Sequence, residues 1–216
     1  MMYKIAKILF LTLILLHLSS CGGNGSEELD KLEHQPLFQL LPPGISNISF
    51  NNQIEENGSF NMVDFFYVYN GGGVAIGDIN NDGLPDIYFT GNMVNDKLYL
   101  NKGGLKFEDI SDSAGITIPG WSTGVTMVDI NHDGLLDIYV CRSGNFDTDQ
   151  RKNLLYINQG NLNFIEQAEV YGIADTSYST QAAFFDYDKD GDLDMYLLNH
   201  TNAIRDPNNV RPLIKD

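Results

Sequence analysis

The most informative stretch of this 216-residue sequence reads Asp78-Ile79-Asn80-Asn81-Asp82-Gly83-Leu84-Pro85-Asp86. It places Asp or Asn at every second position before a glycine and closes on a further Asp. The same pattern returns at residues 129–137 and 186–194, so its first Asp recurs at 78, 129 and 186. A self-similar period of this length is typical of repeated supersecondary units. We call these segments the first, second and third loops.

Short β-type runs accompany the loops and are separated by Gly, Asn and Asp turns. The run Leu98-Tyr99-Leu100-Asn101 of the first repeat matches Leu155-Tyr156-Ile157-Asn158 of the second. Four strands in about fifty residues is the size of one propeller blade. In the first repeat we expect these strands near residues 73–79, 86–91, 97–101 and 106–110.

The predicted fold is therefore all-β, with four-stranded blades of the β-propeller type over residues 45–201. The third repeat contains only its first half, so the prediction amounts to about two and a half blades. Residues 45–50 also have the composition of a strand, and such a strand could complete a blade. We interpret residues 202–216, with Pro207 and Pro212, as an irregular tail and expect the chain to be a piece of a larger protein.

The loop chemistry favours calcium. This ion takes six to eight hard oxygen ligands, and a tight loop turns alternate side chains inward. Glycine at the sixth position permits the sharp turn, and the carbonyl group of the seventh residue adds an oxygen. For about three ions the candidate ligands are Asp78, Asn80, Asp82, Leu84 and Asp86; Asp129, Asn131, Asp133, Leu135 and Asp137; and Asp186, Asp188, Asp190, Asp192 and Asp194.

Two other interpretations compete with this one. An EF-hand requires Glu at the twelfth position and flanking helices, but the twelfth residues are Phe89, Val140 and Leu197, all in β-type runs. An Asp/Asn/Gly hairpin turn without an ion is the plainer alternative. Three copies in register, each with the ninth Asp, favour metal binding, because packed carboxylates repel one another without a cation.

The loops and their flanks resemble FG-GAP/VCBS repeats, as in integrin α-subunit propellers. The segments Asn70 to Ala75, Leu98 to Asn101 and Ala114 to Ile116 are similar to cartilage-acidic-protein-like (ASPIC/UnbV-type) lipoproteins of Bacteroidetes. The resemblance covers roughly residues 45–200 and lacks the C-terminal domain that names that family. It implies a calcium-stabilised extracellular propeller whose ligand is mostly unknown.

The N-terminus has the layout of a secretory signal peptide over residues 1–20. Lys4 and Lys7 precede a short apolar run, and Leu18-Ser19-Ser20-Cys21 resembles a bacterial lipobox. The resemblance implies cleavage before Cys21, a lipid on its thiol, and a linker over residues 21–44. The alternative is an ordinary signal peptide with a chance cysteine. We therefore expect an exported protein, lipid-anchored at the outer membrane or cell surface.

Charge narrows the choice of partners. The chain has 13 basic and 29 acidic residues, a formal net charge of −16, and the three loops hold eleven of the acidic residues. Nucleic-acid binding needs clustered Lys and Arg, so this class is excluded. We predict a non-catalytic module that binds an unknown extracellular protein or glycan. A fragment of a propeller-based glycan-active enzyme and a structural remnant are the alternatives.

Residues outside the loops offer few catalytic candidates. His34, His132 and His200 have no Ser, Cys or paired acid at a recognisable spacing, which favours surface histidines. Cys141 is predicted to be a small buried strand residue. Four aromatic residues before the repeats favour a core role over a sugar-binding face: Tyr67, Tyr69, Trp121 and Tyr178.

Overall fold

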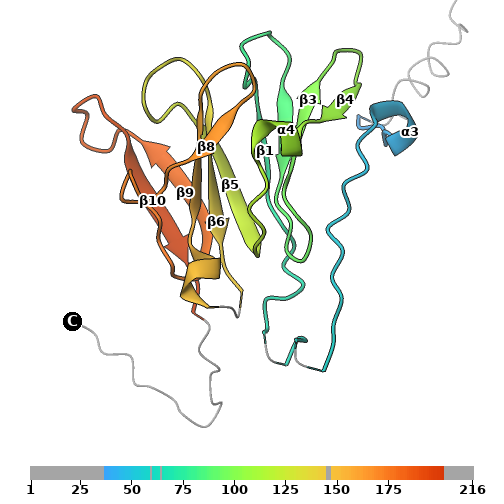
Figure 1. Ribbon diagram of the computed structural model, residues 1–216, viewed down its shortest axis with the longest axis vertical. Helices are drawn as coiled ribbons and strands as arrows, with labels where there is room; N and C mark the ends of the chain where they lie inside the picture. The colour runs from blue at the N-terminus through green and yellow to red at the C-terminus, as the bar shows by residue number, and fades with distance from the viewer. Residues whose placement is uncertain (1–36, 59, 64, 145–146, 202–216) are drawn as a thin grey trace, which may run out of the picture. The chain divides into compact units, whose positions relative to one another are not determined.

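The computed structural model describes residues 37–58, 60–63, 65–144 and 147–201 (Figure 1). The predicted signal peptide, Cys21, His34 and the tail at 202–216 lie outside these residues. The chain divides into two compact units, Met1–Leu41 and Pro42–Asp216. The description below concerns the second unit.

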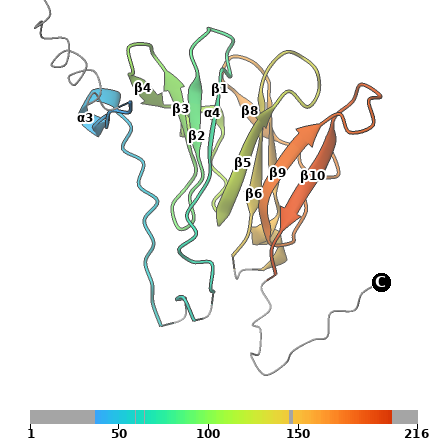
Figure 2. The ribbon, with the colours of Figure 1, turned by 180° about the vertical axis from the view of Figure 1, so that it is seen from behind.

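Three antiparallel sheets confirm the all-β prediction (Figures 1 and 2). Two sheets have four strands in sequential order and the third has two, which matches the expected number of blades. The first sheet contains β1 (Val74–Gly77), β2 (Asp86–Phe89), β3 (Lys97–Asn101) and β4 (Phe107–Asp109); the second contains β5 (Ser122–Val128), β6 (Asp137–Arg142), β7 (Leu154–Asn158) and β8 (Phe164–Glu166); the third contains β9 (Ser179–Phe185) and β10 (Asp194–Asn199).

Helical structure in the described residues is confined to single turns. They are α3 (Pro43–Ser46), α4 (Ser111–Ala114) and the 3₁₀ turn η1 (Thr148–Arg151). The strands therefore supply most of the core, and β6 and β7 are buried along their whole length.

The core lies between neighbouring sheets. One cluster joins the first sheet to the second and includes Tyr88, Leu98, Ile138 and Tyr156. A second cluster joins the second sheet to the third through Tyr139, Cys141 and Leu155 against Ala182. Each sheet thus buries one face against the next, as layered β architectures require.

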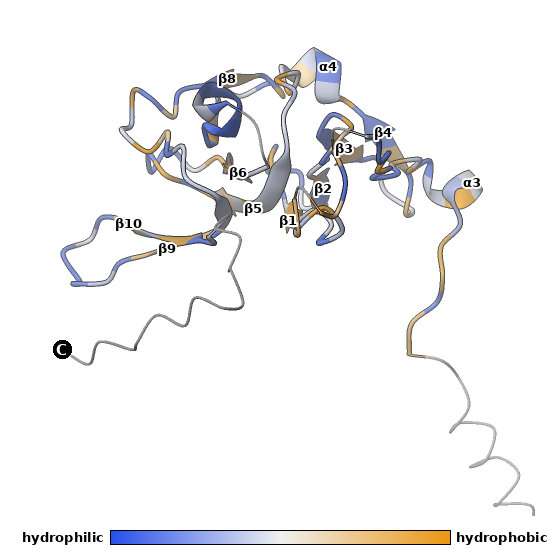
Figure 3. Ribbon diagram, turned by 90° about the horizontal axis from the view of Figure 1, so that it is seen from below, coloured by the Kyte–Doolittle hydropathy of each residue, from blue (hydrophilic) through white to orange (hydrophobic). Residues whose placement is uncertain are grey.

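The first strands of the three sheets are β1, β5 and β9, and we call them the innermost strands. They approach one another closely because glycines face the neighbouring backbone. β5 contacts both β1 and β9, and Figure 3 shows it between them. A Cβ atom on Gly73 would lie 2.7 Å from Thr123 O, and one on Gly124 would clash with Thr180 O. Real Cβ atoms do not approach this closely, so glycine is required where these strands meet.

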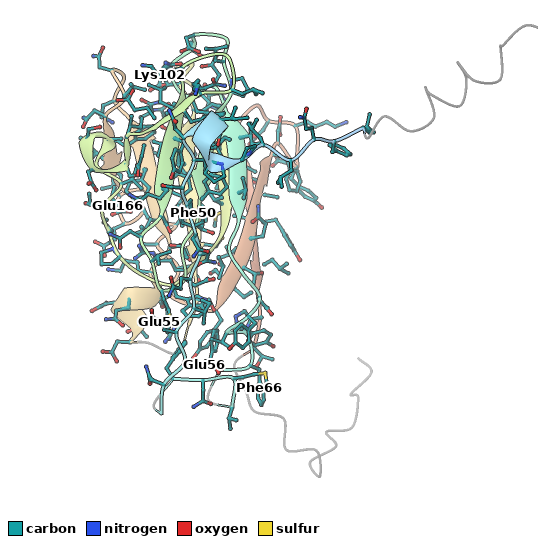
Figure 4. All side chains as sticks on the ribbon, turned by 90° about the vertical axis from the view of Figure 1, so that its right-hand side faces the viewer. Phe50, Glu55, Glu56, Phe66, Lys102 and Glu166 are labelled. Carbon is teal, nitrogen blue, oxygen red and sulfur yellow. The ribbon has the colours of Figure 1, made fainter. Side chains whose placement is uncertain are left out.

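The expected strand at residues 45–50 is wrong. Pro43 begins α3, and Asn47 ends it in the left-handed region with φ 64°. Proline at the first helical position and a left-handed C-cap favour a helical turn over a strand despite the β-type composition. The segment still covers the first sheet, since Phe50 (labelled in Figure 4) stacks on Phe89 at 5.0 Å between ring centroids.

Candidate functional site

The three Asp-rich loops occupy equivalent places in the three sheets. They join β1 to β2, β5 to β6, and β9 to β10, at the upper end of the sheets in Figure 1. The predicted glycine turn is confirmed at the sixth position, where φ is 84° at Gly83, 86° at Gly134 and 98° at Gly191. The three segments therefore share one backbone conformation at this turn.

A second left-handed residue was not anticipated from the sequence. The fourth loop position has φ 58° at Asn81, 58° at His132 and 66° at Lys189. Asn and His tolerate this region better than most residues. An Asn or His at the fourth loop position, between two Asp or Asn residues, could therefore have predicted the left-handed conformation. It also explains His132 as a turn residue.

Side chains of the first loop accept backbone N–H groups around its centre. Asp78 accepts from Asp82 N at 3.1 Å and Gly83 N at 2.7 Å. Asn80 Oδ1 accepts from Asp82 N at 3.2 Å, and Asp82 Oδ1 accepts from Leu84 N at 2.8 Å. The second loop repeats all four bonds with Asp129, Asn131, Asp133, Gly134 and Leu135.

The ninth residue of each loop, which we call the closing Asp, ties the loop to its sheet. Asp86 accepts from Ile79 N at 3.0 Å and from Asn101 N at 2.7 Å, and it is fully buried. Burial raises the pKa of Asp86 above its ordinary value, although the two backbone donors act in the opposite direction. Asp137 is equally buried, accepts from Ile130 and Asn158, and has a pKa raised for the same reason.

The third loop keeps only part of this arrangement. Asp194 accepts from Tyr187 N at 2.8 Å, but its sheet has only two strands among the described residues. Asp190 and Asp192 are fully exposed neighbours, and the Asp190 carboxyl raises the pKa of Asp192. Repulsion between closely spaced carboxylates is the condition that a bound cation would relieve.

Three carboxylates of the third loop lie close enough together to share one cation. Oxygen atoms of Asp186, Asp188 and Asp194 all lie within 4.8 Å of one another. Ligands at about 2.4 Å from a shared calcium ion can be separated by up to about 4.8 Å. The donor set is hard oxygen throughout, which suits calcium.

Among the described residues, the first and second loops do not bring three carboxylates as close together as the third loop does. Asn80 Nδ2 donates to Asp82 Oδ2 at 3.0 Å, and Asn131 Nδ2 donates to Asp133 Oδ2 at 2.9 Å. Only the amide oxygen can coordinate a cation. The Asn80 and Asn131 amides would therefore have to turn their oxygens toward the ion.

The first and second loops are also joined to each other. Asn81 Nδ2 donates to Gly134 O at 2.9 Å. Asn158 Nδ2, from β7, donates to Ile79 O at 2.8 Å and to Leu136 O at 3.2 Å. One amide of the second sheet therefore holds backbone on both loops.

A separate cavity of about 250 Å³ lies near the start of the innermost strands, and its lining includes Phe65, Tyr67, Trp121, Ser143 and His200. The environment of His200 differs from the surface position that the sequence favoured for it. Its ring packs 4.0 Å from that of Tyr67, and its Nε2 lies 2.8 Å from Ser143 Oγ. The sequence had no spacing that relates residue 200 to residue 143.

The aromatic residues before the repeats have different environments. Trp121 is 2% exposed in a cluster with Phe65 and Val68, which confirms its core role. Tyr178 packs on His200 and beneath the Arg151 guanidinium. Tyr69 is 61% exposed, so the core role expected for it is wrong. The structure thus divides these residues between core and surface.

Cys141 behaves as predicted. It lies in β6 with no exposed surface, and burial raises the pKa of its thiol to about 12. A protonated, enclosed thiol is a packing residue.

Among the described residues, no helix is both long and apolar enough to cross a bilayer.

Comparison with known proteins agrees with the predicted resemblance. The family model described as "FG-GAP-like repeat" matches residues 78–140, from the start of the first loop into β6. Cartilage acidic protein 1 of Xenopus tropicalis is 31% identical over 134 residues, which form 61% of this chain and 20% of that protein. The aligned part therefore spans about a fifth of that relative. Residues 78–140 of this all-β chain of propeller-type blades are therefore similar to an FG-GAP-like repeat, as the loops predicted.

Proposed function

We propose that the chain is a calcium-binding module of an exported, lipid-anchored protein, and that it binds an extracellular protein or a glycan without catalysing a reaction. The observation that carries the proposal is the three loops of one sequence pattern and turn conformation at one end of the sheets. The oxygen cluster of Asp186, Asp188 and Asp194 supports a cation.

The bound ion would act on the loops. The oxygens come from three or four side chains and a main-chain carbonyl of one loop, a flexible set that suits calcium better than the strict octahedron of magnesium. Exposed side chains such as Asp82 and Asp133 would close over the ion, while the buried closing Asp residues hold the strand ends. Calcium would therefore stabilise the sheet edges by mass action.

The location at a cell surface rests on sequence and similarity. FG-GAP-like repeats point to a propeller-type binding or adhesion module. Cys21 in its lipobox-like context supports a lipid anchor, and mass spectrometry of the N-terminal peptide tests it. An unmodified Cys21, or cleavage at another bond, would exclude the anchor.

The aromatic cavity is a candidate contact for the ligand. It combines Tyr67 and His200 with uncharged hydrogen-bonding groups, including Asn70 and Thr180. Such a lining suits a neutral polar ligand such as a sugar ring. The Ser143–His200 pair is the observation that favours the enzyme alternative, but Ser143 is fully buried, which disfavours it as a nucleophile.

Calcium titration tests the central proposal. We expect calorimetry of the 216-residue chain to show about three sites and to favour calcium over magnesium. Thermal unfolding in calcium should have a higher midpoint than in chelator, since calcium at about 100 times its Kd adds about 2.7 kcal/mol per site. Equal midpoints in the two conditions would refute calcium binding.

A further inference from the structure

The aromatic cavity at the start of the innermost strands is enclosed by three separate stretches of chain. Its walls come from residues 65–73, from residues 121–124 with Ser143, and from residues 180–181 with His200. It lies at the starts of β5 and β9, whereas the Asp-rich loops follow the other ends of these strands. The cavity is therefore a built pocket that is separate from the candidate ion sites.

The lining of the cavity is uncharged. None of its described residues is Asp, Glu, Lys or Arg, in a chain with 29 acidic and 13 basic residues. His200 Nδ1 lies 3.2 Å from Thr201 O, which can only accept, so Nδ1 carries the proton. In the neutral ring Nε2 then accepts from Ser143 Oγ at 2.8 Å. A charged ligand group would find no counter-ion in this lining, which favours an uncharged ligand.

Two half-buried rings form a platform inside the cavity. The rings of Tyr67 and His200 lie 4.0 Å apart between centroids, and each leaves part of its surface exposed. Phe65 packs against both rings and against Trp121, and it is 1% exposed. Core residues therefore hold the platform in place. The apolar C–H face of a sugar ring packs on aromatic surfaces of this kind.

Polar groups lie beside the platform. The Asn70 side chain is exposed and makes no hydrogen bond with any described residue. Gly71, Gly72 and Gly73 follow it along the lining, so main-chain groups face the cavity without side chains in front of them. Sugar hydroxyls both donate and accept, and an amide side chain offers both kinds of partner.

The repeats differ at the positions that build the cavity. In the second repeat, Ser143 N donates to Trp121 O at 3.0 Å. In the third, His200 N makes the equivalent bond to Tyr178 O at 2.9 Å. The residue types at these paired positions differ, whereas the closing Asp and the Tyr two residues after it are the same in every repeat. The repeat architecture therefore does not dictate which residues line the cavity.

Building on the proposed binding function, on which this assignment rests, we propose that the aromatic cavity binds one uncharged sugar ring, such as the terminal residue of a neutral glycan. The ring packs on Tyr67 and His200, and its hydroxyls bond Asn70 and the main chain of Gly71. The cavity volume of about 250 Å³ lies below the range of about 300–1,000 Å³ for pockets that hold drug-sized ligands. It therefore accepts a single ring rather than several.

Trp121 supplies the readout, because it lines the cavity and is the one Trp of the chain. The 216-residue chain in calcium is titrated with three neutral sugars: methyl glucoside, methyl galactoside and N-acetylglucosamine. Glucuronic acid and N-acetylneuraminic acid are the acidic counterparts. We expect a saturable change in Trp121 emission with at least one neutral sugar, at a Kd of about 1 mM. The acidic sugars should bind at least about tenfold more weakly, because their carboxylates would be buried without a partner.

Variants of the platform and of its rim test the contacts. Tyr67→Ala removes one ring and should raise the Kd about tenfold, whereas Tyr67→Phe keeps the ring and should stay within about twofold. Asn70→Ala removes an exposed amide and should raise the Kd about threefold. Tyr69→Ala is the matched control, since Tyr69 is 61% exposed and does not line the cavity. Thermal unfolding checks that each variant folds, and Asn70→Ala decides if Tyr67→Ala does not.

Calcium-dependent melting is measured in parallel, so failure of the ion sites and failure of the sugar site are separate results. Constant Trp121 emission with every neutral sugar at about 10 mM would overturn the sugar site, even where calcium raises the melting midpoint. Acidic sugars that bind as tightly as neutral ones would also overturn it, as would equal effects of Tyr67→Ala and Tyr69→Ala. A response to an uncharged Gly-Ser peptide, with none to the sugars, would assign the cavity to a protein ligand instead.

Discussion

The second and third sheets differ in how firmly they hold loops of one sequence pattern. In the second sheet, Asp137 is fully buried between a loop N–H and the N–H of Asn158. In the third sheet, Asp194 is partly exposed and bonds only the loop side among the described contacts. The comparison indicates that the third strand, rather than the loop itself, fixes the carboxylate.

The largest expected difference concerns stability without metal. Asp137→Ala leaves the buried N–H of Asn158 and the partly buried N–H of Ile130 without acceptors. Since one fully buried N–H costs about 1–3 kcal/mol and a partly buried one costs less, unfolding in urea and chelator should lose about 2–4 kcal/mol. Asp194→Ala is the matched change and should cost less than about 1 kcal/mol, because Tyr187 is 76% exposed. Equal losses would mean that the third strand does not strengthen the loop.

Calcium affinity gives the next contrast. The third loop carries five Asp and Lys189, against three Asp in each other loop, so charge alone ranks it tightest. We expect rigidity to outweigh charge, with the first two sites about tenfold tighter, or about 1.4 kcal/mol. Calorimetry of Asp82→Ala, Asp133→Ala and Asp190→Ala checks this order. Loss of the tightest site in Asp190→Ala would reverse the ranking.

The reactivity of the Cys141 thiol measures how often the third sheet separates from the second, because Cys141 packs between these two sheets. At pH 8 its enclosed thiol should react slowly with an alkylating reagent, and full reactivity should appear in denaturant. Asp194→Ala should accelerate the reaction by up to about fivefold, since its cost of less than about 1 kcal/mol falls on local opening. Asp86→Ala at matched global stability is the control, and an equal acceleration there would argue against local opening.

The smallest effect concerns the bond between the first and second loops. Asn81→Gly keeps the left-handed backbone but removes the donor to Gly134 O, and should cost about 0.5 kcal/mol. His132→Gly makes the same backbone change at the same φ of 58°. Urea unfolding compares the two variants, and a loss no larger for Asn81→Gly would show that the bond contributes nothing.

Local features of the fold were predictable because they repeat. The strand predicted near 97–101 is β3, Lys97–Asn101, and the one near 106–110 contains β4, Phe107–Asp109. Gly, Asn and Asp mark each turn directly, and three copies of one pattern reinforce the interpretation.

Long-range features were not predictable in the same way. The pairing of His200 with Ser143 joins residues 57 positions apart and has no sequence spacing behind it. At residues 45–50, β propensity competed with the turn set by Pro43 and Asn47, and the turn prevailed. The burial of the closing Asp depends on a strand that follows it by 15 to 21 positions.

The bond from Asn158 to Ile79 O has a consequence for the order of events during synthesis. Its two residues are 79 positions apart, so the first loop leaves the ribosome well before the amide that holds it. At about 5–20 residues per second, this delay is about 4–16 s. During that interval the first loop lacks this bond, which only the later second repeat can supply.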